Sequence, residues 1–116
     1  MRSLFFCCVL LLMQACSQKD CSEIPTHFDS YEDAVSFVKN AHFAFKEEVN
    51  TSKSSWIRAA SYYSCDGKTG FFIFSTDKQE YIHRDMPIEI WNEFKNAESF
   101  GKYYNANIKH KYHFEL

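Results

Sequence analysis

An apolar run at the N-terminus limits where a folded domain can begin in this chain. Arg2 gives a positive start, residues 4–13 are apolar without interruption, and Ala15 precedes Cys16. A membrane-spanning helix needs about 20 apolar residues, so this run is too short to span a bilayer. A charged start, a short apolar centre and a small residue at the end are typical of a secretory signal peptide. We therefore expect residues 1–15 to be removed and the domain to form from the rest of the 116 residues.

The end of the run resembles a bacterial lipobox, with the sequence Leu12-Met13-Gln14-Ala15-Cys16. In that motif the cysteine becomes the new N-terminus and its thiol carries lipid, so we expect Cys16 to be acylated, with palmitate as a typical chain. Each buried methylene contributes about 0.8 kcal/mol, so several chains anchor a small protein firmly. The alternatives are an ordinary signal peptide cut near Ala15 and a retained N-terminal helix.

The polar residues after Cys16 bear on the location of the protein. They read Ser17-Gln18-Lys19-Asp20, and they resemble in part the export signal that follows the lipidated cysteine in Bacteroidetes lipoproteins. A solvated tether is the other interpretation. We expect a protein attached by lipid to a bacterial outer membrane, either on its periplasmic side or exposed at the surface.

Charge argues against a nucleic-acid partner. The chain has 13 basic and 15 acidic side chains, and removal of the leader takes away one basic residue, Arg2, and no acidic one. Nucleic-acid-binding proteins usually concentrate basic residues on one surface, and this composition offers no such excess. We expect the partners to be the membrane, through the N-terminal lipid, and a protein or an envelope ligand.

The cysteines leave one pair to be explained. Cys7 and Cys8 leave with the leader and Cys16 is assigned to the lipid, so Cys21 and Cys65 remain. Extracytoplasmic compartments permit disulfides, but a sequence does not supply the geometry that a bridge requires. A disulfide between Cys21 and Cys65 and two free thiols therefore stay open as alternatives.

Hydrophobic periodicity predicts an α+β fold. We expect an N-terminal helix from about Ser30 to Ala41, a small antiparallel sheet of about four strands, and one or two C-terminal helices packed on one face, the first starting at Pro87. The expected strands cover residues 42–49, 56–63, 70–75 and 80–84, with a loosely alternating edge strand at 108–116. The predicted organisation is a signal peptide (1–15), a tether (16–28), a helix–strand extension (29–53) and a C-terminal domain (54–116).

The C-terminal part carries a series of short motifs. They are Ser54-Ser55-Trp56-Ile57, a strand tyrosine at Tyr62 or Tyr63, Tyr81-Ile82-His83, Met86-Pro87 and Ala97-Glu98-Ser99-Phe100-Gly101-Lys102-Tyr103-Tyr104-Asn105. Together they resemble the KTSC domain family, a small domain also found at the C-terminus of some lysyl-tRNA synthetases. His83 stands where the family pattern has a second tyrosine. The resemblance implies the RNA-binding role that has been suggested for the family, which suits an acidic exported chain poorly.

A candidate binding patch lies on one predicted strand. Tyr81 and His83 point to the same face because side chains two apart in a strand share a face. With Arg58 and Tyr63 nearby, they would form a polar aromatic patch able to hold a ligand. The alternative is a structural role, in which the tyrosine hydroxyl bonds to a helix or to the C-terminal tail.

We expect neither a catalytic site nor a metal site nor a cofactor. Ser54 and Ser55 lack a partnered base in the sequence pattern, and such serines usually form turns or caps. His110 and His113 can share a metal, with His83 as a third ligand, only if their segment is helical, and the alternation there favours a strand.

The expected function is therefore non-enzymatic. We interpret the chain as a lipid-anchored envelope protein whose KTSC-like domain binds a protein or an envelope ligand. Three alternatives stay open: an immunity-type or accessory lipoprotein with one specific partner, an RNA-binding module as suggested for the family, and a small hydrolase.

Overall fold

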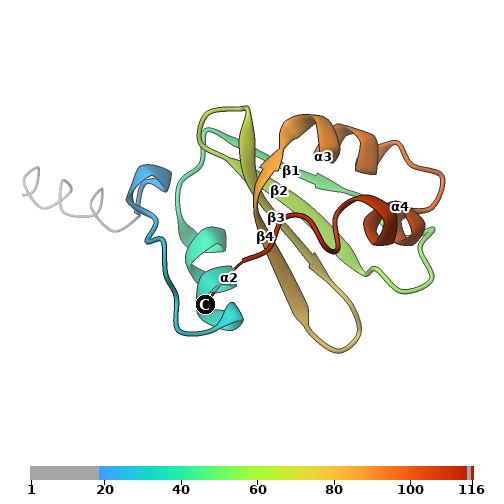
Figure 1. Ribbon diagram of the computed structural model, residues 1–116, viewed down its shortest axis with the longest axis horizontal. Coiled ribbons are helices and arrows are strands. Elements are labelled where there is room, and N and C mark those ends of the chain that lie inside the picture. Colours follow the sequence, from blue (N-terminus) through green and yellow to red (C-terminus); the bar gives the residue numbers. More distant parts are fainter. Residues whose placement is uncertain (1–18, 115) are drawn as a thin grey trace, which may run out of the picture.

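A four-stranded antiparallel sheet with its strands in chain order is the centre of the structure (Figure 1). The computed structural model describes residues 19–114 and residue 116, so the predicted signal peptide and Cys16 lie outside the described residues. The strands are β1 (Phe45–Val49), β2 (Ala59–Ser64), β3 (Thr69–Ser75) and β4 (Glu80–Pro87). The helices are a short 3-10 helix, η2 (Cys21–Glu23), and the α-helices α2 (Tyr31–Asn40), α3 (Ile88–Lys95) and α4 (Phe100–Asn107). The predicted α+β fold is confirmed.

One face of the sheet packs against α3 and α4. Side chains alternate along a strand, so Tyr62 of β2 and Phe72 of β3 point to this face. The Tyr62 ring stacks on Trp91 of α3 with centroids 5.5 Å apart, and Phe72 meets Phe94 edge to face at 5.0 Å. The two predicted C-terminal helices therefore share one face and enclose the larger of two apolar cores.

The other face packs against α2. Val35 and Val38 of this helix are buried with Ile73 of β3 and Ile82 of β4. The helix begins as predicted, because the Ser30 hydroxyl accepts the backbone N–H of Asp33 at 3.1 Å and satisfies one of the free donors of the first turn. Figure 1 shows α2 well apart from α3 and α4. The sheet is thus covered from both sides.

A bulge prolongs β4 beyond the predicted strand. Phe72 pairs with His83 but Gly70 pairs with Met86, so β4 contains one extra residue in this stretch. Asp85 takes up the irregularity with a φ of 57°. The bulge returns Met86 to the same face as His83, and the strand then leads through Pro87 directly into α3.

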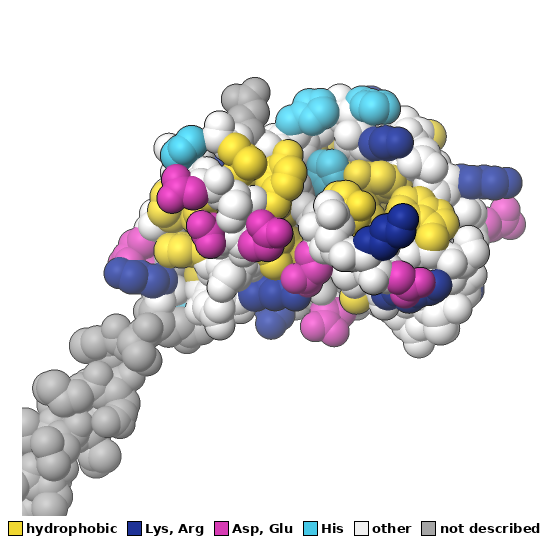
Figure 2. Space-filling model, turned by 90° about the horizontal axis from the view of Figure 1, so that it is seen from below, with side chains coloured by type: hydrophobic (Ala, Val, Ile, Leu, Met, Phe, Trp, Pro, Cys, Tyr) yellow, Lys and Arg dark blue, Asp and Glu magenta, His cyan; other side chains and the backbone are white. Residues whose placement is uncertain are grey.

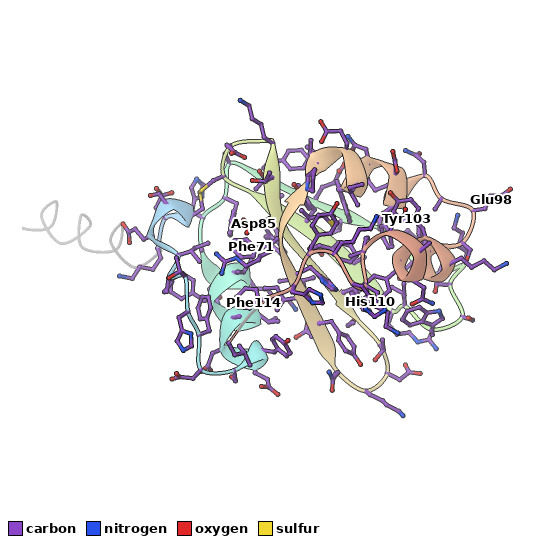
Figure 3. The ribbon with its side chains drawn as sticks, viewed as in Figure 1. Phe71, Asp85, Glu98, Tyr103, His110 and Phe114 are labelled. Atoms are coloured by element: carbon purple, nitrogen blue, oxygen red, sulfur yellow. A yellow bond between two sulfur atoms is a disulfide. The ribbon has the colours of Figure 1, made fainter. Side chains whose placement is uncertain are left out.

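Two sequence expectations need correction. The strand predicted at 56–63 begins only at Ala59, because the Ser54 hydroxyl accepts the N–H groups of Trp56 (3.3 Å) and Ile57 (3.0 Å) and holds the chain in a turn. The described part of the segment 108–116 forms no edge strand. It passes from α4 across the sheet, and its Phe114 packs 6.3 Å from Phe71 of β3 (Figure 3).

Residues 19–28, assigned from sequence to a polar tether, are attached to the domain. Cys21 and Cys65 form a disulfide with their Cα atoms 5.9 Å apart. The Cys21 N–H donates to the His42 carbonyl at 2.9 Å, and the His42 N–H donates to the Lys19 carbonyl at 2.7 Å. Phe28 is buried in the core beside α2. The chain is thus held to the fold from residue 19 onward.

Replacing Cys21 and Cys65 together by serine tests the contribution of the cross-link. The bridge closes a sequence separation of 44 residues, for which the loop-entropy relation gives about 4 kcal/mol of stabilisation. We expect urea denaturation to show a loss of about this size in the double variant. Wild-type protein under reducing conditions is the control and should resemble the variant. Equal urea midpoints for the variant and the oxidised wild type would contradict the prediction.

Candidate functional site

The four residues of the predicted binding patch are divided between the two faces of the sheet. Tyr81 and His83 belong to the face covered by α3 and α4, whereas Tyr63 is buried on the α2 face with 3% of its surface exposed. Arg58 lies just before β2 and pairs with Asp77, with Nε and Oδ1 2.8 Å apart. The structure therefore does not bring these residues together as one surface.

His83 is buried and both of its ring nitrogens are hydrogen-bonded. Its Nδ1 lies 2.8 Å from the Tyr112 carbonyl oxygen, which only accepts, so Nδ1 carries the proton and donates. Its Nε2 lies 2.9 Å from the Tyr104 hydroxyl, which then donates to it. Burial lowers the pKa of His83 and raises the pKa of Tyr104 to about 12, so both groups are neutral near pH 7. This arrangement fastens the tail and α4 to the sheet, a structural role.

Glu47 has a comparable structural role on the same face. Its Oε1 accepts hydrogen bonds from the Trp91 indole N–H and the Lys95 ammonium, each at 2.7 Å. The bond from Lys95, followed by that from Trp91, lowers the pKa of the Glu47 carboxyl. These bonds connect β1 to α3, and Glu48 points to the opposite face because side chains alternate along a strand.

Two of the sequence motifs meet at a small hollow of about 170 Å³ lined by Ser54, Trp56, Ser99 and Gly101 among others. A Cβ on Gly101 would lie 2.3 Å from the indole nitrogen of Trp56, so only glycine permits this approach. The Ser99 hydroxyl accepts the Lys102 N–H at 3.2 Å and caps α4, while Ser54 caps the turn before β2. The hydroxyls in these motifs therefore stabilise the backbone.

A larger hollow of about 610 Å³ lies on the α2 face, over β1 and β2. It exists because α2 packs over β4 and leaves this half of the face open, and because the outward side chains of β2 here are small, Ala59 and Ser61. Lys46 of β1, Arg58 and Glu48 border it. Sequence reasoning missed this hollow, although two small side chains at alternate strand positions were its signal.

Cations outnumber carboxylates around this hollow. Lys39, Lys46 and Arg58 line it, and Glu48 is the one acidic residue among its described lining residues. Lys39 forms an exposed ion pair with Glu80, whereas Lys46 places its ammonium 5.5 Å from the centre of the Tyr63 ring. Since Asp77 also pairs with Arg58, Lys46 is the one cation of the hollow with no carboxylate within ion-pair distance in the described part of the chain.

The described residues hold no group of three His, Cys, Asp or Glu side chains placed to share a metal ion. His110 lies in the turn after α4 (Figure 3), and His83 has both nitrogens engaged. On the face drawn in Figure 2, acidic and basic side chains are interspersed, and no continuous basic strip crosses it. Within residues 19–114, no helix has the length and apolar character needed to cross a bilayer.

His83→Gln separates the structural hydrogen bonds of His83 from its titration. The folded protein holds the pKa of His83 below the ordinary 6.5, so at lower pH the unfolded chain binds a proton that the folded chain does not. The stability due to neutral His83 is complete above pH 6.5 and is lost as the pH falls toward the folded-state pKa, by up to about 1.4 kcal/mol per pH unit. Glutamine keeps one donor and one acceptor without titrating.

We expect the free energy of unfolding of the wild type to fall relative to that of His83→Gln between pH 7 and pH 5. Chemical denaturation at several pH values measures this difference. A difference that stays constant across the range would show that His83 is not the group responsible.

Comparison with known proteins agrees with the motifs. The family model of the KTSC domain matches residues 53–112, just over half of the chain, which includes β2 to β4, α3 and α4. No curated protein and no solved structure gives a significant match. The matched segment contains both the Ser54 turn and the close contact between Trp56 and Gly101. On this evidence the chain belongs to the KTSC domain family.

Proposed function

We propose that this protein is a non-enzymatic, lipid-anchored protein of the bacterial outer membrane, whose domain binds an acidic segment of a partner protein. The observation that carries the proposal is the open half of the α2 face, with its 610 Å³ hollow and the cations Lys46 and Arg58 in its lining. The anchor is the lipid expected on Cys16, at the end of a leader with the features of a lipoprotein signal.

The charges around the hollow favour a carboxylate-bearing ligand. Arg58 and Asp77 have side chains 46% and 75% exposed, and exposed ion pairs of this kind contribute only about 0–1 kcal/mol. A ligand carboxylate that excludes water from the hollow can therefore replace Asp77 as the partner of Arg58. Lys46 has no carboxylate within ion-pair distance in the described part of the chain, so it is available to the same ligand.

The engagement of the hydroxyl and imidazole groups favours binding over catalysis. The Ser54 and Ser99 hydroxyls cap backbone N–H groups, and His83 bonds to Tyr104 and to the tail. A nucleophile and a base need a free proton-transfer path to a substrate, and these groups are already committed to the fold. The polar hollow offers recognition by shape and charge.

Charge reversal at Lys46 tests the binding site. A photo-reactive amino acid at Ser61, inside the hollow, should crosslink to an acidic peptide of a partner in native membranes of the producing bacterium. Lys46→Glu should reduce the crosslinked product roughly tenfold, which corresponds to about 1.4 kcal/mol. Mass spectrometry of the crosslinked peptide reads out the product.

Lys102→Glu is the matched control, because Lys102 is an exposed lysine on α4, away from the α2 face. It should leave the product unchanged. Equal products from the Lys46→Glu and Lys102→Glu proteins, or a crosslinked peptide without acidic residues, would overturn the assignment of the hollow.

Cys16→Ser tests the anchor. Loss of the thiol removes the point of lipid attachment, so the protein should move from the membrane fraction to the aqueous fraction. Fractionation followed by immunoblotting measures the change, and Cys21→Ser, which keeps Cys16, should stay with the membrane. Unchanged membrane partitioning of Cys16→Ser would refute the lipid anchor.

A further inference from the structure

We propose that the end of the domain at the turn between β2 and β3 rests on the membrane that carries the lipid, so that the hollow extends away from the bilayer along β2. This inference rests on the lipid anchor proposed above. It follows from where the N-terminal segment is attached to the fold, which the expected tether of residues 16–28 did not anticipate.

The number of residues between Cys16 and Lys19 limits the distance between the lipid and the domain. Among the described residues, Lys19 is the first that is held to the domain, because its carbonyl accepts the His42 N–H at 2.7 Å. Lys19 comes three positions after Cys16, and an extended chain spans at most about 3.6 Å per residue, so the reach is at most about 11 Å. If the chain were free as far as Phe28, the reach would be about 43 Å by the same relation. The attachments thus keep the domain near the membrane surface.

Two kinds of bond hold the segment in place. Asp20 forms a parallel bridge with His42, and one residue later Cys21 is cross-linked to Cys65. Hydrogen bonds alone, each worth about 1 kcal/mol net, would let such a terminal segment fray. The disulfide prevents this, because it adds a covalent connection to the turn after β2 (Figure 3).

The turn that receives the disulfide is itself well braced. The Ser64 hydroxyl donates to the Thr69 carbonyl at 2.6 Å and accepts the Gly67 N–H at 2.8 Å. The Asp66 carboxylate accepts the N–H groups of Lys68 and Thr69 at 2.8 and 3.1 Å. Cys65 is therefore a firm attachment point, and the orientation of the tether is transmitted to the whole sheet.

The direction of β2 then places the hollow. Cys65 follows the end of β2, whereas Ala59, which lines the hollow, is its first residue. At about 3.3 Å per residue, the six residues from Ala59 to Cys65 span about 20 Å. In Figure 1, η2 lies at one end of the molecule and α4 at the other, and Lys53 of the loop before β2 bonds to Ala97 near α4. The end of the hollow at Arg58 and Ala59 is thus farther from the lipid than its end at Tyr63, two residues before Cys65.

The surface at this end suits lipid headgroups rather than acyl chains. Its exposed residues are polar or charged and include both signs: Asp20, Ser22, Glu23, Asp66 and Lys68. Inserting such groups into hydrocarbon is costly, so this end makes contact at the aqueous surface of the bilayer. This end of the domain therefore contacts the lipid headgroups.

Energy transfer on vesicles tests the orientation. The lipidated full-length mature protein carries a fluorescent amino acid at Lys68, beside the disulfide, or at Ser52, in the loop before β2. Each is reconstituted in phosphatidylethanolamine–phosphatidylglycerol vesicles with an acceptor dye on the headgroups. We expect quenching at Lys68 to exceed that at Ser52 by roughly twofold or more, since the two ends of β2 lie about 20 Å apart and therefore at different distances from the headgroup dye. Reduction, or Cys21→Ser with Cys65→Ser, should shrink this difference.

Vesicle flotation of the same samples separates the two proposals. Protein that floats with the vesicles but is quenched equally at both positions would overturn the orientation and leave the anchor in place. Protein that fails to float would overturn the anchor and the orientation together. Ser22→Ala, an exposed change within η2 that keeps the disulfide, is the control and should retain the wild-type difference in quenching.

Discussion

Burial of β3 on both faces is the constraint on which the rest of the fold depends. Phe72 and Phe74 point into the core formed with α3 and α4, while Ile73 points into the core formed with α2. Full burial of a large apolar side chain contributes about 1.5–3 kcal/mol, so these three side chains together contribute an amount comparable to the net stability of a small domain. A continuous apolar strand requires cover from both sides, and the two separate helical layers follow from that requirement.

The local signals in the sequence determined most of the elements. Ser30 caps α2 as the sequence predicted, and Pro87 leads into α3. Such signals act within a few residues and are unaffected by tertiary contacts. The tail is different. Its alternating residues resemble a strand whether or not a neighbouring strand supplies hydrogen bonds, and an apolar residue such as Phe114 can be buried in either case. The position of β4 and α2 decides whether the tail pairs as a strand or packs through its side chains.

The candidate site was harder to predict for the same reason. His83 and Tyr81 share a face as the period of a strand requires, but their exposure depended on α4, whose Tyr104 covers His83. The hollow over β1 and β2 depended on where α2 ends, which no residue of β2 encodes. Ala59 and Ser61 indicate a shallow strand surface only once the extent of the covering helix is known.

The contacts that stabilise the fold and most of the cations of the hollow come from different parts of the chain. The matched segment, residues 53–112, supplies the turn and cap hydroxyls and the close Trp56–Gly101 contact, all of which stabilise the fold. Lys39 and Lys46, two of the three cations of the hollow, and Cys21, which fixes the tether, come from the part before residue 53. The hollow therefore combines residues of the extension with Arg58, Ala59 and Ser61 of the family domain. Another KTSC domain without that extension would lack Lys39, Lys46 and the disulfide partner Cys21.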